Sequence, residues 1–206
     1  MRCRLVLGRD RAAVADALSD AFAQDPLMSW LIGLDDPAAR AVALRTAMFV
    51  PAVRAAGRGG NSFLLQDDAG TVAGAALWVA PDSGFFTRAD VELVRSELAQ
   101  WADPGAEQRL GALGEVLGRH HLTPPADQPH FHLQFLGMAG AHRGRGSGAS
   151  LLGPVLARCD ADGLAATLES SNPRNLSFYR RLGFETVWED APEGGPILTG
   201  MARGPR

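Results

Sequence analysis

A glycine-rich loop, Arg143-Gly144-Arg145-Gly146-Ser147-Gly148, is the feature of this sequence that most restricts the fold. It follows an apolar stretch with strand character, Phe131 to Met138, and leads into Gly146 to Ala161, where apolar residues recur at helical spacing. Glycines let the backbone approach an anion closely and adopt positive φ angles. The helix that follows offers unpaired amides and the positive end of its dipole. The loop therefore predicts a strand–loop–helix unit that cradles a pyrophosphate.

Outside this loop, helical and strand patterns alternate and predict an α/β fold. Apolar residues at helical spacing predict helices over residues 10–22, 37–56, 88–101, 106–120, 146–161 and 173–182. Short apolar runs predict strands over residues 4–7, 62–66, 71–79, 131–138, 164–169, 184–188 and 197–201. Residues 25–34 are expected to form a turn followed by apolar bulk between the first two helices. Together these elements predict a mixed sheet with helices on its faces.

Length and charge limit the classes to which the protein can belong. A chain of 206 residues is expected to form one domain, residues 1–206. The net charge of −3 argues against nucleic acid as a partner, and no apolar run is long enough for a membrane span. The early charges in the first ten residues argue against a secretory signal. Cys3 and Cys159 have neither metal-ligand spacing nor a disulfide pattern, so a cytoplasmic location is expected.

The chain has no lysine, since all 20 of its basic residues are arginine. A P-loop needs a lysine to reach the nucleotide phosphates, and a pyridoxal enzyme needs one to form the Schiff base. Both classes are therefore excluded.

A dinucleotide site is an alternative reading of the same loop. The spacing Gly144-x-Gly146-x-x-Ala149 fits a Rossmann fingerprint, and Glu169 follows 20 residues after Ala149, where an acid would bind the ribose. A Rossmann loop, however, normally follows the first strand of its domain. Only 57 residues follow Ala149, which leaves room for about one further βα unit.

Further motifs around the loop carry a resemblance to a known family. The motifs are Phe135-Leu136-Gly137-Met138, Arg143-x-x-Gly146-x-Gly148, Asn172-Pro173-x-Asn175 and Phe178-Tyr179-x-x-Leu182-Gly183-Phe184. In this order and spacing, residues 130–188 resemble the acetyl-coenzyme A-binding core of the GNAT N-acetyltransferases, and the first half of the chain matches in element order. The segment from Leu168 to Asn175 resembles the branch that contains the puromycin acetyltransferase-like enzymes.

The resemblance implies a single-domain GNAT fold with a mixed, mostly antiparallel sheet. The strand ending at Met138 and the strand ending near Glu169 are expected to splay apart, with the pantetheine arm of acetyl-coenzyme A in the gap. Residues 10–57 and 85–121 are then helical elements on the acceptor side. No metal is expected. The implied activity moves acetyl directly to a primary amine of a small molecule or peptide, in a monomer or a homodimer. The alternative is a non-catalytic acyl-coenzyme A-binding module.

The resemblance also implies roles for the residues that contact the coenzyme. Backbone groups of Met138 and Ala139 would pair with the pantetheine, and the amide of Met138 would polarise the thioester carbonyl. Arg143 and Arg145 are candidates to reach a phosphate, with solvated side chains as the alternative. The amides expected to hold the pyrophosphate belong to Gly144, Arg145, Gly146, Ser147, Gly148 and Ala149.

Asn175 and Tyr179 lie four residues apart on a predicted helix, so they share one face. The resemblance turns that face toward the coenzyme and makes Tyr179 the general acid that protonates the departing thiolate. The alternative is a core tyrosine bonded to Asn175. Glu169 is the candidate base, directly or through a water.

Several other side chains stay open as candidates. His130 and His132 share a strand face and are further candidates for the base. A metal site built from these two with His120 and His121 is an alternative, for which adjacent histidines in a polar connector are weak evidence. On the acceptor side, Asp25, Met28 and Trp30 are expected to line the substrate site with Leu31, and Phe85 and Phe86 to shape another wall. The alternative is that these are core residues with a helix cap at Asp25.

Overall fold

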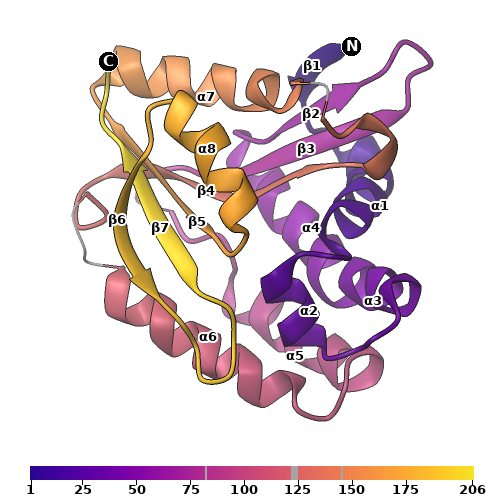
Figure 1. Cartoon of the computed structure of the whole chain (residues 1–206). Helices are drawn as coiled ribbons and strands as arrows, with labels where there is room; N and C mark the ends of the chain where they lie inside the picture. Colours follow the sequence, from indigo (N-terminus) through magenta and orange to yellow (C-terminus); the bar gives the residue numbers. More distant parts are fainter. Residues whose placement is uncertain (82, 122–124, 145) are drawn as a thin grey trace.

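The computed structural model describes residues 1–81, 83–121, 125–144 and 146–206, so the predicted phosphate contact Arg145 lies outside the described residues. These residues contain a seven-stranded sheet in the order β1-β2-β3-β4-β5-β7-β6 (Figure 1). Its strands are β1 (Arg2–Leu5), β2 (Phe63–Gln66), β3 (Val72–Val79), β4 (His130–Met138), β5 (Ala165–Ser170), β6 (Glu185–Asp190) and β7 (Leu198–Arg203). Neighbours pair antiparallel except β4 and β5, which are parallel. The predicted mixed, mostly antiparallel sheet is confirmed.

Helices cover both faces of the sheet, as predicted. On one face, α1 (Arg11–Phe22) and α4 (Val50–Gly59) pack on β3, and their apolar residues form a core cluster with α2, α3 and α5. On the other face, α7 (Gly148–Asp162) and α8 (Pro173–Arg181) form a second cluster with the sheet (Figure 1). The remaining helices are α2 (Pro26–Ile32), α3 (Pro37–Leu44), α5 (Arg88–Trp101) and α6 (Ala106–His120). No described helix has the length and apolar character that a membrane crossing requires.

The sheet opens between β4 and β5. These strands pair only from His130 to Leu133, opposite Ala165 to Leu168. Beyond Leu133, β4 stays with β3, where Leu77 pairs with Phe135 and Trp78 with Leu133. Gln134 is therefore the extra residue of a β-bulge, which bends and twists the strand. The predicted splay between the ends of these strands is confirmed, and the bulge lies where it begins.

The expectation of a turn at residues 25–34 is wrong, because the segment contains α2. The Asp25 carboxylate accepts hydrogen bonds from the amides of Leu27 and Met28, and Pro26 takes the first helical position. Gly33, with a φ of 71°, ends the helix in the left-handed conformation. The helix predicted over residues 37–56 is also not one regular α-helix. Arg45–Phe49 form a π-helical turn that separates α3 from α4.

Asp90 joins α5 to α4 through a buried carboxylate. Its side chain is 1% exposed and contacts Arg54 and Arg58 at 2.5 Å each. It also accepts hydrogen bonds from Thr87, the N-cap of α5. Burial alone would raise the pKa of Asp90, but the hydrogen bonds from Thr87 and the two arginines outweigh it and hold the pKa far below its usual value.

We expect Asp90→Asn to lower the free energy of unfolding at pH 7 by about 2 kcal/mol, or the melting temperature by about 4–8 °C. Because the folded pKa is depressed, this stabilisation is present above the unfolded value of 3.8 and is lost as the pH falls below it. The difference between the melting temperatures of the two proteins should therefore shrink as the pH falls from 7 to 3. Glu92→Gln, which removes an exposed ion pair with Arg88 on the same helix, is the control and should change little. Equal melting temperatures of Asp90→Asn and wild type at pH 7 would contradict this role.

Candidate active site

The splay between β4 and β5 opens into a cavity of about 600 Å³, which we call the splay cleft. It lies where the end of α1, the end of β4, the glycine-rich loop and α8 meet. The structure brings together seven of the residues predicted to contact the coenzyme, and Ala139, Ser147 and Ala149 lie outside the lining. Those seven are Met138, Arg143, Gly144, Gly146, Gly148, Asn175 and Tyr179.

The backbone of β4 presents free groups to this cleft at alternate residues. The amide of Ala139 donates to the carbonyl of Ala73 in β3 at 2.9 Å, and the Ala139 carbonyl accepts from the His142 amide. Hydrogen bonds between antiparallel strands alternate, so the amides of Leu136 and Met138 point away from β3 and into the splay. The amide of Met138 is thus open to a ligand, whereas both backbone groups of Ala139 are already bonded within the protein.

The loop has the backbone conformation that glycine permits. Gly144 and Gly146 have φ angles of 73° and 72°, and a Cβ added at either would meet nothing within 4 Å. Helix α7 begins at Gly148, and its N-cap Ser147 makes no side-chain capping bond. Among the described residues, Ser147 therefore leaves these first amides uncapped by its side chain, at the positive end of the helix dipole. This end of the splay cleft suits an anion.

Arg143 ties the loop to α1. Its guanidinium donates to the carbonyls of Met138 at 3.1 Å and of Asp20 and Ala21 at 2.8 Å each. The residue is exposed, but these three hydrogen bonds hold its guanidinium against the end of β4 and the last turn of α1. Sequence reasoning missed Arg174 and Arg181, two exposed arginines of α8 that also line the splay cleft. The available signal was their place inside the quoted motifs, where Arg174 is the unspecified residue of Asn172-Pro173-x-Asn175 and Arg181 precedes Leu182.

Tyr179 is 6% exposed and lines the splay cleft next to Asn175. Its ring is held by Phe178 and Phe184, with centroids 5.2 and 6.0 Å away. Burial, and then the nearby charge of Asp25, raise the pKa of its phenol well above the usual value. In the described part of the chain, no hydrogen bond joins the hydroxyl to Asn175. A phenol with a raised pKa therefore lies where the two groups Asn175 and Tyr179 line the cleft.

A second cavity of about 390 Å³, the inner cavity, adjoins the splay cleft. Both Asp25 and Met28 line it, together with Leu31 and Phe86. Trp30, which was expected in the same wall, does not. It packs instead beside the cluster of Leu113, Val116 and Leu198 and against the turn at Gly195. Five residues line both cavities and mark the passage between them: Phe22, Asp25, Leu136, Asn175 and Tyr179.

Asp25 serves the fold and the cavity together. Besides capping α2, its carboxylate accepts a hydrogen bond from the hydroxyl of Ser171 at 3.0 Å. Burial raises its pKa despite these bonds. The helix cap considered from the sequence is therefore present, and the carboxylate lines both cavities as well.

Glu169 faces the inner cavity and pairs with a histidine behind it. Its carboxylate lies 3.2 Å from Nε2 of His132, whose Nδ1 lies 2.9 Å from the hydroxyl of Thr167. Burial would lower the pKa of His132, but the charge and hydrogen bond of Glu169 outweigh it and raise the pKa. Sequence reasoning did not single out Gln134, the bulge residue that also lines the inner cavity.

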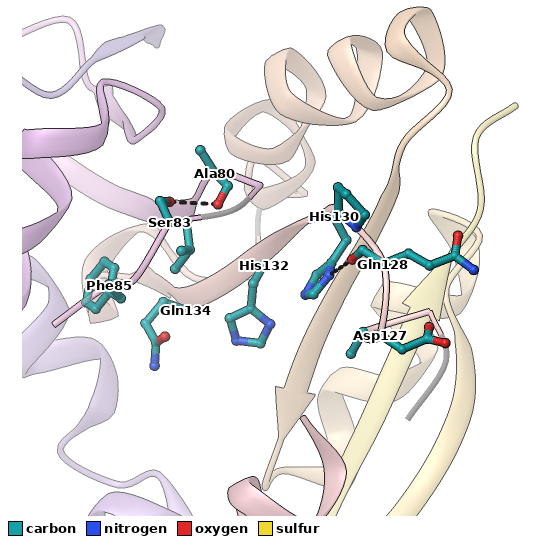
Figure 2. Close-up of a pocket in the computed structure, with 11 residues that line it drawn as sticks. Ala80, Ser83, Phe85, Asp127, Gln128, His130, His132 and Gln134 are labelled. Atoms are coloured by element: carbon teal, nitrogen blue, oxygen red, sulfur yellow. Dashed lines mark hydrogen bonds between the residues drawn. The ribbon is translucent and has the colours of Figure 1, made fainter. Parts of the chain in front are cut away.

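His132 opens onto a separate side cavity of about 430 Å³. Figure 2 shows His130, His132 and Gln134 projecting from β4 into it, with Phe85 at one end. His130 is turned to the carbonyl of Gln128, 2.6 Å away. Neither histidine lines the inner cavity, so among the three candidate bases only Glu169 does.

Other chemistries find little support at this site. Cys3 and Cys159 line neither the splay cleft nor the inner cavity, and burial raises the pKa of Cys159 to about 11. The described residues contain no group of three or more His, Cys, Asp or Glu side chains that could hold a metal ion. A Rossmann domain requires a parallel sheet, whereas the described strands include one parallel pair.

Comparison with known proteins identifies the class. A model of the acetyltransferase (GNAT) family matches residues 76–184, more than half of the chain. The chain belongs to the GNAT family, and it is an acyl-coenzyme A-dependent N-acetyltransferase. The family uses acetyl-coenzyme A as co-substrate.

Solved structures share the fold over nearly their whole length. A "histone acetyltransferase HPA2 and related acetyltransferase" from Corynebacterium glutamicum is 26% identical with a TM-score of 0.72, over 99% of this chain and 96% of that one. Arylalkylamine N-acetyltransferase 2 from Aedes aegypti is 17% identical with a TM-score of 0.64, over 100% and 99%. A polyamine N-acetyltransferase from Drosophila melanogaster is also 17% identical with a TM-score of 0.64, over 98% and 99%. At 17% identity the likeness shows the fold alone.

Proposed function

We propose that this protein transfers acetyl from acetyl-coenzyme A in the splay cleft to the primary amine of a small molecule in the inner cavity. The observation that carries the proposal is the junction of the two cavities. Asn175 and Tyr179 line both of them there, beside the open amides of β4. A thioester that enters along β4 and an amine that enters from the inner cavity would meet at this junction.

The coenzyme would be held mainly by backbone groups. Amides of the loop around Gly144, Gly146 and Gly148 would bind the pyrophosphate at the start of α7. The pantetheine would lie along β4, where the amide of Met138 is directed into the splay. A fixed amide of this kind stabilises the oxyanion that develops on the thioester carbonyl. Arg174 and Arg181 supply positive charge at the mouth of the same cleft.

Each proton of the reaction has a candidate partner. The amine nitrogen attacks the thioester carbon, the carbon–sulfur bond breaks, and the amine gives up a proton while the thiolate takes one. Glu169 would accept the amine proton, directly or through a water, because it alone of the candidate bases lines the inner cavity. Its partner His132 would hold the carboxylate in place and pass the proton toward the side cavity. Tyr179 would protonate the thiolate.

Two simple measurements test this function. Acetyl-coenzyme A should raise the melting temperature of the protein, since a ligand that binds only the folded state stabilises it, and NAD and NADP should not. Addition of primary amines to the acetyl-coenzyme A complex should then release free thiol. If acetyl-coenzyme A stabilises the fold but no amine in a broad panel releases thiol, the protein is a binding module. If NAD stabilises it and acetyl-coenzyme A does not, the assignment of the cleft is wrong.

A further inference from the structure

The inner cavity has walls of opposite character. The polar groups all come from β4, from β5 with the residue after it, from α8 and from Asp25 at the passage. Every residue contributed by α2, the π-helical turn, α6 and β7 is apolar or glycine, and Phe86 completes this apolar wall. Helices α2 and α6 lie side by side there (Figure 1). The side chains of the apolar wall include Leu31, Met48, Phe86, Leu110, Leu117 and Leu198.

The charges of the cavity lie only on the polar side. Among the described residues, the lining contains two ionisable carboxylates and no arginine or histidine. Glu169 is paired with His132, and Asp25 is bonded to two amides and to Ser171. No carboxylate lines the apolar wall. If an acceptor carried a second ammonium group besides the reactive amine, that group would lie among the leucines of the apolar wall. It would lose its hydration without gaining a charged partner, which is strongly unfavourable.

On the basis of the proposed function, we propose that the acceptor is a primary monoamine with an apolar body, such as an arylalkylamine or a longer alkylamine. The reactive nitrogen lies at the passage beside Tyr179 and Glu169, and the apolar body contacts the wall of α2 and α6. A polyamine would bring an unpaired cation to this wall, and a peptide would bring amide groups that find no hydrogen-bond partner there. The cavity volume of about 390 Å³ lies within the range of small-molecule sites.

The test uses two amines that differ only in a second ammonium group, hexylamine and 1,6-diaminohexane, each with saturating acetyl-coenzyme A. We expect kcat/KM for thiol release to be at least about tenfold higher with hexylamine, after correction for the two equivalent ends of the diamine. A diamine within tenfold of the monoamine, or better, overturns the inference and leaves the proposed function intact. If neither amine, nor any other, releases thiol, the proposed function fails and this inference falls with it.

A variant tests whether the apolar wall causes the preference. Gly114 of α6 lines the inner cavity, and a Cβ added there would meet nothing within 4 Å. Gly114→Glu adds a carboxylate to the apolar wall. It should lower the ratio of kcat/KM with hexylamine to kcat/KM with 1,6-diaminohexane at least about tenfold. Gly114→Gln, which has the same shape without the charge, should not narrow it. Gly111→Glu, on the same helix but outside the lining, should also leave the ratio unchanged. An unchanged ratio in Gly114→Glu contradicts the placement of the acceptor body.

Discussion

Replacing Tyr179 by phenylalanine should slow acetyl transfer by about 10²- to 10⁴-fold and leave the affinity for acetyl-coenzyme A nearly unchanged. The phenol contributes only when the thiolate leaves, so its loss should lower kcat rather than weaken docking. The hydroxyl has no hydrogen bond to Asn175 in the described residues, and the ring is held by Phe178 and Phe184. The variant should therefore keep the melting temperature of the wild type.

Single-turnover kinetics are the appropriate measurement, because they report the chemical step when product release limits kcat. Tyr179 is the only tyrosine in the chain, so no other phenol can replace it. A single-turnover rate within about twofold of wild type corresponds to less than about 0.5 kcal/mol of barrier, and it would remove Tyr179 from the mechanism. A large loss of coenzyme affinity in the variant would instead make Tyr179 a binding residue.

Gly146→Glu should weaken acetyl-coenzyme A binding by about 100-fold or more in a protein that still folds. The side chain adds bulk and a negative charge where the pyrophosphate is proposed to bind. Because a Cβ at Gly146 would meet no protein atom within 4 Å, the structure has room for the substitution. The φ of 72° adds a conformational cost, on the order of 1–2 kcal/mol, that affects stability.

A matched control separates that conformational cost from the effect on binding. Gly194 also has a positive φ, 67°, and open space around an added Cβ, but it lies in the turn between β6 and β7, outside the splay cleft. Gly194→Glu should lose similar stability and keep full affinity. Titration calorimetry on both folded variants distinguishes the outcomes. Equal affinities of Gly146→Glu and Gly194→Glu would contradict the loop assignment.

The parts of the fold that the sequence predicted well are specified by local signals. Helix α5 was predicted with its observed bounds, and its start is fixed by the capping box of Thr87 and Asp90. Helix α8 has an Asn172 cap and Pro173 at its first position. By contrast, α2 is only seven residues long and carries no readable period, so the available signals were its cap at Asp25, Pro26 at its first position and the stop at Gly33. The bulge at Gln134 depends on pairing with β3 and has no local signature.

The same distinction explains the candidate site. Residues of the splay cleft, such as Met138, Gly146 and Asn175, lie within one contiguous segment whose motifs carry the family resemblance. The inner cavity is assembled from α2, α6 and β7, which are distant in sequence, so its lining follows from tertiary packing. Two residues apart in sequence, Met28 lines this cavity and Trp30 does not, and no local signal separates them.

Direct transfer of acetyl from the coenzyme to an amine can be distinguished from an acetylated enzyme intermediate by the stoichiometry of the products. Protein, acetyl-coenzyme A and hexylamine are mixed, and free thiol and N-acetylated amine are counted over time, with a parallel reaction that lacks the amine. Direct transfer predicts one thiol for each amide, no thiol burst without amine, and no acetylated protein by mass spectrometry, since neither cysteine lines the site. A burst of thiol equal to the protein concentration in the absence of amine, with acetyl bound to the chain, would contradict direct transfer.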